Sequence, residues 1–258
     1  MKFSVIGHKK VAVSFAHYLK KNGFDLVAFY CDDIEKCVDC AIETGCKAYT
    51  DFEDVINDSE LIVLSLDDFS LKNTMRTIAL MDVKNKIFLT LGYSQSTDLM
   101  NVGNNNTYFS VFIPKVIRSD GITDLSDVTL FIEGVGKDYW DFYDELYIHN
   151  IKFEFIDKTK KLVYNISSKL VSDIIFTFCN FAQDILNDVE LDIKNIESFA
   201  QNSVLEVFKH SQSIEKSDFG NITDNLNLID ANLAKKVEAI YKVLDIMSKR
   251  DKNNGKKY

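Results

Sequence analysis

The N-terminal segment, residues 2–30, constrains the fold of this chain more than any other part of the sequence. It opens with a β-rich run over Lys2–Ile6, which Gly7 ends. Apolar residues then recur at helical spacing as far as Leu19. A second run, over residues 26–30, is almost entirely apolar, which is typical of a strand in a parallel sheet covered on both faces. The segment therefore predicts a β-α-β unit.

The turn after the first strand has the pattern of a phosphate-binding loop with one departure. The pattern G-x-G-x-x-G/A uses small residues for a tight turn, for close approach of backbone to pyrophosphate, and for packing of helix on strand. Gly7 and Ala12 occupy the first and third positions, and Lys9 occupies the second. In one interpretation Lys9 or Lys10 adds positive charge to a helix N-terminus that attracts phosphate, and His8 contacts the cofactor. In the other, the segment only connects strand to helix.

Two aspartates, Asp32 and Asp33, follow the second strand. An acidic side chain at this position accepts hydrogen bonds from a ribose 2′-hydroxyl and repels a 2′-phosphate. If a nucleotide binds, Asp32 therefore favours NAD over NADP as the cofactor. The alternative is that one of the two aspartates caps the helix expected from Ile34, and each aspartate can serve one of the two roles.

Strands and helices continue to alternate beyond this unit. Strands are expected over residues 47–49, 60–66, 86–91, 108–113, 128–133 and 152–156, with helices starting near residues 34, 52, 70 and 139. This alternation predicts an α/β fold with a doubly wound, mostly parallel sheet of the Rossmann type. We expect residues 1–157 to form this dinucleotide-binding domain.

Strand signals disappear from residue 158 onward. Helices are expected over residues 162–187, 193–210 and 225–249, so residues 158–250 are predicted to form an all-helical domain for substrate binding or dimerisation. Residues 251–258 form a short polar tail that we expect to be disordered. The helices contain more Phe, Leu and Ile than so small a domain can bury alone, and this favours a homodimer formed through the helical domain.

Residues at the ends of strands are candidates for ligand binding, since ligands of doubly wound sheets lie beyond the carboxyl ends of the strands. Ser65 and Leu66 follow one apolar strand and are predicted to flank the nicotinamide side of a cofactor. Gly92 and Pro114 follow the next two strands and are predicted to face the substrate. The alternative is ordinary turn chemistry at the ends of strands.

The long helix over residues 162–187 carries polar residues that suit reduction of a carbonyl or imine. Lys169 and Asp173 lie one turn apart, as a lysine donor with a polar partner, and are the predicted catalytic pair. Tyr164 and Asn165 are predicted to add to the substrate wall. The alternative is that this polar face is simply solvated.

Charge and composition exclude several functions. A formal net charge of −9 argues against general nucleic-acid binding. We find no apolar run of membrane-spanning length and no signal peptide, so we expect a cytoplasmic protein that acts on a small molecule and does not bind a membrane.

Four cysteines lie close together in sequence, and two of them, Cys37 and Cys40, have metal-ligand spacing. They fall in a helical stretch where Cys37 shares an apolar stripe with Ile34, and no histidine is nearby. Free cysteine commonly behaves as a small buried hydrophobe. We therefore expect buried thiols and predict no metal site, with a zinc or redox role as the alternative.

The order of short motifs resembles a family of Rossmann-like proteins with a helical C-terminal domain of unknown function. The motifs are VIGHKKVA, LSLDD, TLGY, FIPK, FIEG, LVYNISSKLVSD and FGNITDNL, and together they cover nearly the whole chain. The N-terminal domain of that family is similar to those of the deazaflavin-dependent NADP oxidoreductases and the pyrroline-carboxylate reductases. The resemblance implies an NAD(P)-dependent oxidoreductase that acts on a small C=O or C=N substrate.

This chain departs from the family at several polar positions. Lys9 stands where the family has a glycine, and Asp173 stands where it has an asparagine. The family's His-Pro pair appears here as Ile113-Pro114, and its Tyr-His pair appears as Tyr164-Asn165. Its Arg-Gly-Asp-like turn appears as Phe219-Gly220-Asn221. Loss of both histidines removes the groups best suited to proton transfer near neutral pH. The alternative function is therefore a catalytically inactive protein that senses a nucleotide or metabolite, or serves as a dimeric interaction partner.

Overall fold

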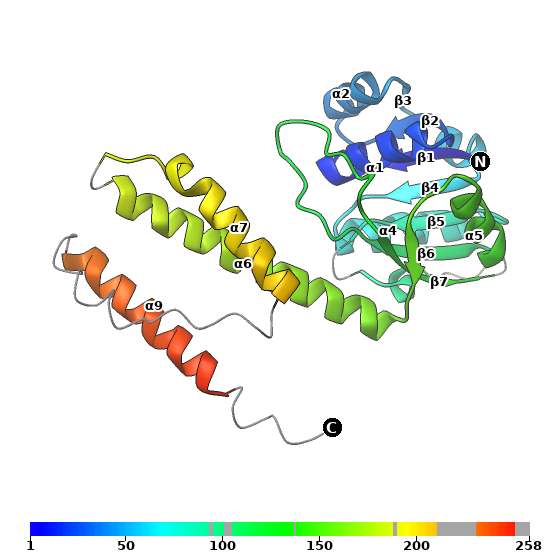
Figure 1. The fold of residues 1–258 in the computed structure, drawn as a ribbon. Helices are drawn as coiled ribbons and strands as arrows, with labels where there is room; N and C mark the ends of the chain where they lie inside the picture. The colour runs from blue at the N-terminus through cyan, green and yellow to red at the C-terminus, as the bar shows by residue number, and fades with distance from the viewer. Residues whose placement is uncertain (93–94, 101–104, 137, 188–189, 211–230, 251–258) are drawn as a thin grey trace. The chain divides into compact units, whose positions relative to one another are not determined.

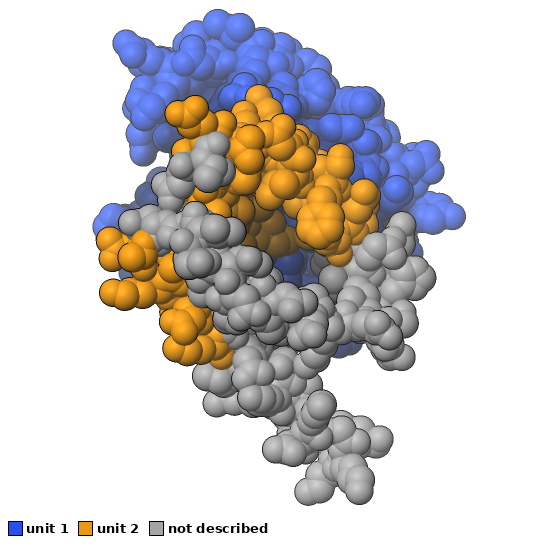
Figure 2. Space-filling model, turned by 60° about the vertical axis from the view of Figure 1, so that its left-hand side comes forward, with its two compact units in different colours: residues 1–171 blue, residues 172–258 orange. Residues whose placement is uncertain are grey.

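The computed structural model describes residues 1–92, 95–100, 105–136, 138–187, 190–210 and 231–250 of the chain (Figure 1). The chain divides into two compact units, residues 1–171 and residues 172–258, which Figure 2 distinguishes by colour. The expected tail and the turn Phe219-Gly220-Asn221 lie outside the described residues.

Unit 1 is built around one eight-stranded sheet. Its strands are β1 (Lys2–Ile6), β2 (Asp25–Tyr30), β3 (Lys47–Tyr49), β4 (Leu61–Leu64), β5 (Ile87–Thr90), β6 (Thr107–Phe112), β7 (Leu130–Val135) and β8 (Phe153–Phe155). They lie in the order β3-β2-β1-β4-β5-β6-β7-β8, and only β6 and β7 pair antiparallel. Strand order reverses direction between β1 and β4, as in a doubly wound sheet. The predicted α/β fold with a mostly parallel sheet is confirmed.

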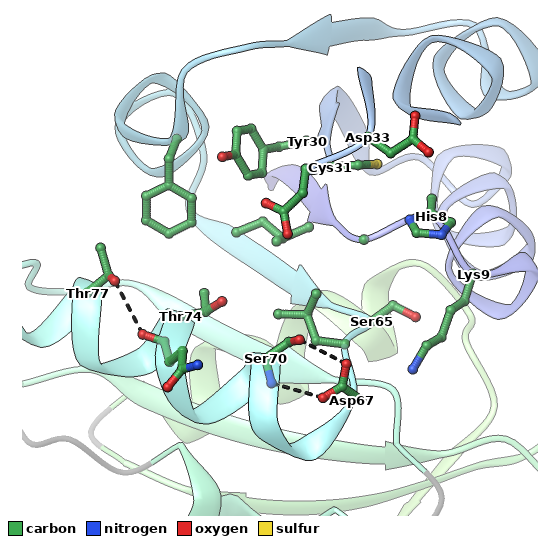
Figure 3. A pocket seen from close by; sticks show the side chains of 16 residues that line it. His8, Lys9, Tyr30, Cys31, Asp33, Ser65, Asp67, Ser70, Thr74 and Thr77 are labelled. Atoms are coloured by element: carbon green, nitrogen blue, oxygen red, sulfur yellow. Dashed lines mark hydrogen bonds between the residues drawn. The ribbon is translucent and has the colours of Figure 1, made fainter. Parts of the chain in front are cut away.

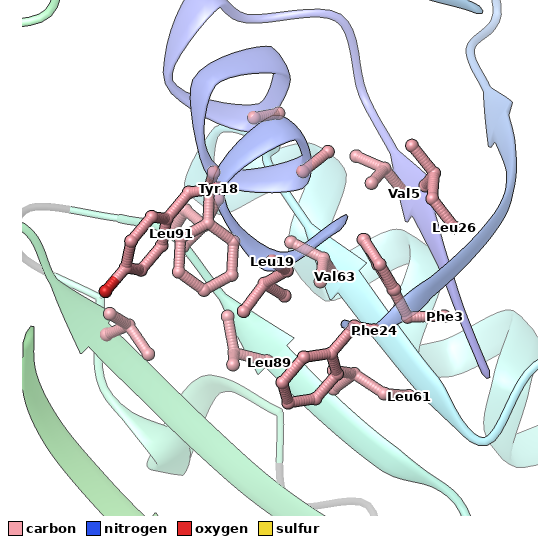
Figure 4. Packing of buried hydrophobic residues seen from close by; sticks show 14 of the residues in the cluster. Phe3, Val5, Tyr18, Leu19, Phe24, Leu26, Leu61, Val63, Leu89 and Leu91 are labelled. Atoms are coloured by element: carbon pink, nitrogen blue, oxygen red, sulfur yellow. The ribbon is translucent and has the colours of Figure 1, made fainter. Parts of the chain in front are cut away.

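Helices cover both faces of this sheet. They are α1 (Lys10–Lys21), α2 (Ile34–Thr44), α3 (Phe52–Asn57), α4 (Asp68–Leu80) and α5 (Tyr139–Ile148). Side chains of α1, α2 and α5 belong to one core cluster, and Figure 4 shows Leu19 of α1 within it. Side chains of α3 and α4 belong to a second cluster. β4 sends Leu61 and Val63 to the first cluster and the residue after each to the second, which explains why this strand is apolar throughout.

The remaining helices begin with α6 (Lys158–Asn187), which starts four residues before its predicted position. The boundary between the two units falls inside α6, after Val171. A 3-10 helix η2 (Ile193–Ile196), α7 (Glu197–His210) and α9 (Ala231–Arg250) follow. Residues 225–230, the predicted start of the last helix, lie outside the described residues.

The length and composition of α6 satisfy the criteria for a membrane-crossing helix. The expectation that no apolar run is long enough therefore does not hold for α6. One such helix is weak evidence of a span, and its first turn carries a lysine, Lys161, that forms a buried ion pair within unit 1.

Candidate functional site

A cavity of about 470 Å³ lies at the carboxyl ends of β1, β2 and β4 (Figure 3). We call it the nucleotide pocket after the role that the sequence predicts for its lining, and its volume is typical of small-molecule sites. Its lining includes six residues that the sequence singled out for cofactor binding, namely Gly7, His8, Lys9, Asp32, Ser65 and Leu66. The fold therefore brings these six together, and their binding role remains a prediction. The seventh, Ala12, is on the fully buried face of α1 and does not line the pocket.

Gly7 forms the floor of the pocket where β1 meets the end of β4. Its φ of +116° lies in the region that favours glycine. A β-carbon there would overlap the carbonyl oxygen of Ser65 and lie 3.0 Å from its carbonyl carbon. The turn is also held by the Gly7 amide, which donates to the Tyr30 carbonyl at 2.9 Å. The first glycine of the loop is therefore required by the backbone of this chain.

Ser65 contributes a buried polar atom to the same place. The residue is 2% exposed, and its hydroxyl oxygen makes no hydrogen bond to any described part of the chain. Buried polar groups are nearly always hydrogen-bonded. A ligand in the nucleotide pocket can supply the missing partner, so the residues present fit a polar occupant.

Lys9 stands at the N-cap of α1 in an ordinary extended conformation, with φ −66° and ψ 146°. The second loop position therefore needs no glycine for its backbone angles, which explains how lysine is accommodated. The Lys9 side chain is exposed and makes no ion pair with any described residue, and in Figure 3 it extends toward the α4 side of the pocket. The ammonium of the next residue, Lys10, does form an ion pair, with Glu43 at 2.8 Å.

Of the two aspartates after β2, Asp33 takes the helix-cap role that the sequence left open. Asp33 caps α2 by accepting from the Lys36 amide at 3.3 Å, and its pKa is lowered chiefly by the Lys36 side chain, 3.0 Å away. Both aspartates line the nucleotide pocket and are exposed to solvent. They differ in that Asp33 is engaged as the cap of α2, and the ribose-binding role of Asp32 stays a prediction.

The wall formed by α4 was not anticipated from the sequence. Ser70, Asn73, Thr74 and Thr77 line the pocket on one face of α4. Asp67 caps this helix by accepting from the amides of Phe69 at 3.0 Å and Ser70 at 2.9 Å. Across the pocket, Tyr30 and Phe52 pack edge to face at 5.5 Å. The helical spacing of the four polar residues was the signal in the sequence, because they alternate with the buried Leu71, Met75 and Ile78.

The residues predicted to face the substrate do not line the nucleotide pocket. Gly92 lines a separate cavity of about 10 Å³ at the ends of β5 and β6, together with Val11, Leu91, Val111, Phe112, Ile113 and Ile117. None of these lining side chains can ionise. Pro114 is exposed just beyond this cavity.

The candidates on α6 occupy different environments. Tyr164 stacks on Phe131 of β7 at 4.5 Å, and Asn165 is 6% exposed. Lys169 and Asp173 are both exposed, and the boundary between the units falls between them. Tyr164, Asn165 and Lys169 belong to unit 1, and they do not line the nucleotide pocket. The catalytic and substrate roles of this set remain predictions.

The cysteines are free thiols. The Cys37 thiol donates to the Phe29 carbonyl at 3.2 Å, and burial raises the pKa of Cys40 to about 11. Both residues are buried. Among the described residues no group of three or more His, Cys, Asp or Glu side chains could hold a metal ion.

The structure resembles solved reductases along nearly its whole length. A protein from Bacteroides fragilis whose assignment as an NADP oxidoreductase is itself an inference matches with a TM-score of 0.73 at 15% identity, over 96% of each chain. The reductive aminase from Aspergillus terreus, in complex with NADPH and ethyl-5-oxohexanoate, matches with a TM-score of 0.65 at 13% identity, over 93% of this chain and 92% of that one. A pyrroline-5-carboxylate reductase from Coxiella burnetii matches with a TM-score of 0.59 at 12% identity, over 96% and 92%.

The chain has the Rossmann-type fold of these solved structures. The structural likeness to NADP oxidoreductases and pyrroline-carboxylate reductases that the motifs implied is thus confirmed. No protein-family model matches the chain, and no curated protein matches its sequence. At identities of 12–15% the likeness shows the fold and leaves the reaction to be tested.

Proposed function

We propose that the nucleotide pocket binds a nicotinamide dinucleotide, and that the protein is an NAD(P)-dependent oxidoreductase acting on a small C=O or C=N substrate. The observation that carries the proposal is the Gly7 turn, which brings the backbone of β1 against Ser65 where both residues line the 470 Å³ cavity. The Ser65 hydroxyl, to which no described residue is hydrogen-bonded, supports it further. The cofactor supplies the hydride, and the protein positions it.

Lys9 is proposed to bind the pyrophosphate together with the N-terminus of α1. No described residue forms an ion pair with its ammonium, whereas the Lys10 ammonium is held by Glu43. We expect Lys9→Gly to weaken NAD binding by about tenfold, the order of one hydrogen bond between charged groups, as measured by calorimetric titration. Lys10→Met is the matched control and should leave the affinity within about twofold. Stronger binding by Lys9→Gly would instead mean that the side chain obstructs the loop.

Asp32 is proposed to select NAD over NADP by binding the ribose hydroxyls and repelling a 2′-phosphate. We expect Asp32→Asn to lower the ratio of NAD to NADP affinity by about tenfold, since it removes the repelling charge. Asp39→Asn makes the same charge change on an exposed face of α2 outside the pocket. An unchanged ratio in Asp32→Asn would remove Asp32 from cofactor selection.

The reaction end of the site is proposed from the sequence candidates. Ser65 and Leu66 would flank the nicotinamide, and Gly92, Pro114, Tyr164 and Asn165 would shape the substrate wall. Lys169, with Asp173 one turn away, would supply the proton to a carbonyl or imine. We propose these roles for a cytoplasmic enzyme with a small-molecule substrate.

A second candidate function is a nucleotide sensor without catalysis. It is favoured by the cavity at the ends of β5 and β6, which is small and lined only by non-ionisable side chains. The two functions separate experimentally, because a sensor binds NADH without transferring its hydride to any of a panel of ketones and imines.

Homodimerisation is proposed through the apolar surface of α6. Ile166, Leu170 and Phe176 of this helix are 57%, 57% and 67% exposed, and exposed apolar surface on this scale marks an interaction site. We expect size-exclusion chromatography with light scattering to give twice the chain mass at micromolar concentration, and Phe176→Glu to lower it. A wild-type monomer under these conditions would refute the dimer.

A further inference from the structure

A buried polar cluster around Gln95 lies directly beside the nucleotide pocket. Gln95 is 4% exposed. Its amide nitrogen donates to the Leu66 carbonyl at 3.1 Å and to Asp68 Oδ1 at 2.9 Å. Leu66 lines the pocket, and Asp68 is the first residue of α4. Gln95 therefore holds the backbone at the point where the α4 wall of the pocket begins.

The other side of Gln95 is held from the sheet. Its amide oxygen is hydrogen-bonded to the Thr90 hydroxyl at the end of β5. Gly92 makes room for this arrangement, because a β-carbon there would overlap the Gln95 amide. Gly92, which the sequence suggested for substrate binding, thus has a structural reason to be glycine.

A buried ion pair completes the cluster. Lys161, in the first turn of α6, lies 2.7 Å from Glu133 Oε2 of β7, and both side chains are nearly inaccessible to solvent. The Lys161 ammonium also donates to the main-chain carbonyl oxygen of Gln95 at 2.7 Å and to the Ser110 hydroxyl. The second oxygen of Glu133 accepts from the amide and hydroxyl of Thr97. Gln95 is therefore fixed between the start of α6 and the start of α4.

We propose that Gln95 is a positioning residue for the nucleotide pocket and that Lys161, acting through it, ties the first turn of α6 to the N-terminus of α4. The consequence for ligand binding rests on the proposed function, and the consequence for the backbone at Leu66 does not. A buried network in which each member fixes the next transmits a displacement of one end to the other. A change at the first turn of α6 should therefore alter the pocket although Lys161 does not line it.

If the Lys161–Glu133 ion pair only stabilises the fold, a different result is expected. Replacing a buried ion pair by apolar residues of similar size is often neutral or stabilising. The double variant Lys161→Met/Glu133→Leu should then keep a wild-type melting temperature and an unchanged pocket. If the pair positions Gln95, the double variant folds and the pocket is altered.

The chain offers a matched control in the same turn of α6. Lys158 pairs with Asp98 at 2.5 Å, so it too joins α6 to the η1 segment (Thr97–Leu99), but both side chains are more than half exposed. Exposed pairs of this kind contribute little. Lys158→Met should leave the pocket unchanged.

The first measurement is amide hydrogen exchange, by mass spectrometry, of the protein without nucleotide. In Gln95→Met and in the double variant we expect the segment over residues 66–71 to exchange about tenfold faster than in wild type, as expected for loss of a hydrogen bond to a charged group. Lys158→Met should exchange like wild type. Wild-type exchange in both Gln95→Met and the folded double variant would overturn the proposal.

The second measurement is calorimetric titration of the same proteins with NAD. We expect binding to be about tenfold weaker in Gln95→Met and in the double variant, with wild-type affinity in Lys158→Met. Faster exchange together with unchanged NAD affinity would overturn the role in the pocket. Faster exchange in a protein whose wild type binds no nucleotide would refute the proposed function and leave the backbone role of Gln95 intact.

Discussion

Gly7→Ala is expected to destabilise the folded chain by about 2–4 kcal/mol and to abolish nucleotide binding. Gly7 is buried with φ +116°, a conformation that alanine adopts only with strain. The added β-carbon would also overlap the Ser65 carbonyl oxygen. Relief of that overlap requires β1 and the end of β4 to move apart, which opens the floor of the pocket. Urea unfolding followed by circular dichroism measures the stability, and calorimetry with NAD measures the binding.

Gly121→Ala is the control for this change. A β-carbon on Gly121 meets no atom within 4 Å, so its effect should lie within about 0.5 kcal/mol. Equal stability of Gly7→Ala and wild type would show that the turn relaxes freely, and the argument from close approach would then fail.

Lys161→Met alone is expected to destabilise the chain by about 3–5 kcal/mol, because it leaves the Glu133 carboxylate buried without its partner. Burial lowers the pKa of Lys161, and the neighbouring Glu133 carboxylate opposes that shift. The ammonium is thus costly to bury and is retained by its ion pair. Urea unfolding should show the full loss in the single variant.

Adding Glu133→Leu to Lys161→Met should recover most of the lost stability, since no unpaired charge then remains buried. The difference between the single and double variants separates the cost of an orphaned carboxylate from the contribution of the pair itself. A single variant as stable as wild type would mean that water reaches Glu133, contrary to its burial in the structure.

Much of the fold was accessible from the sequence because local signals agree with it. The apolar run at β4 predicted a strand, and the two core clusters that share its side chains explain why that run is apolar throughout. The order of strands and helices gave the mostly parallel sheet. The antiparallel pairing of β6 with β7 had no local signal, because it depends on the path of the long connection between them.

The candidate site was accessible only in part. The turn at Gly7 carries a short motif, and the rules for doubly wound sheets placed Ser65 and Asp32 beside it. The choice between Asp32 and Asp33 as helix cap depends on cap geometry that the sequence does not contain. The sequence did not indicate the position of Gln95 beside the pocket, because its hydrogen-bond partners come from segments far apart in the chain. Networks of this kind are specified by tertiary packing and not by spacing in the sequence.

The start of α6 illustrates the same limit. Apolar periodicity placed it at residue 162, whereas the helix begins at Lys158 and buries Lys161. Lysine is seldom fully buried, so the pattern gave no reason to start the helix before residue 162 or to place Lys161 against the sheet. The buried partner, Glu133, is far away in the sequence.

Calorimetric titration of the purified protein with NAD, NADH, NADP and NADPH tests the central claim most directly. We expect NAD or NADH to bind with a micromolar dissociation constant, and the two 2′-phosphorylated forms to bind more weakly, because Asp32 lines the pocket. Binding of none of the four at millimolar concentration would contradict the account, and the pocket between Gly7, Asp32 and α4 would then require a different ligand.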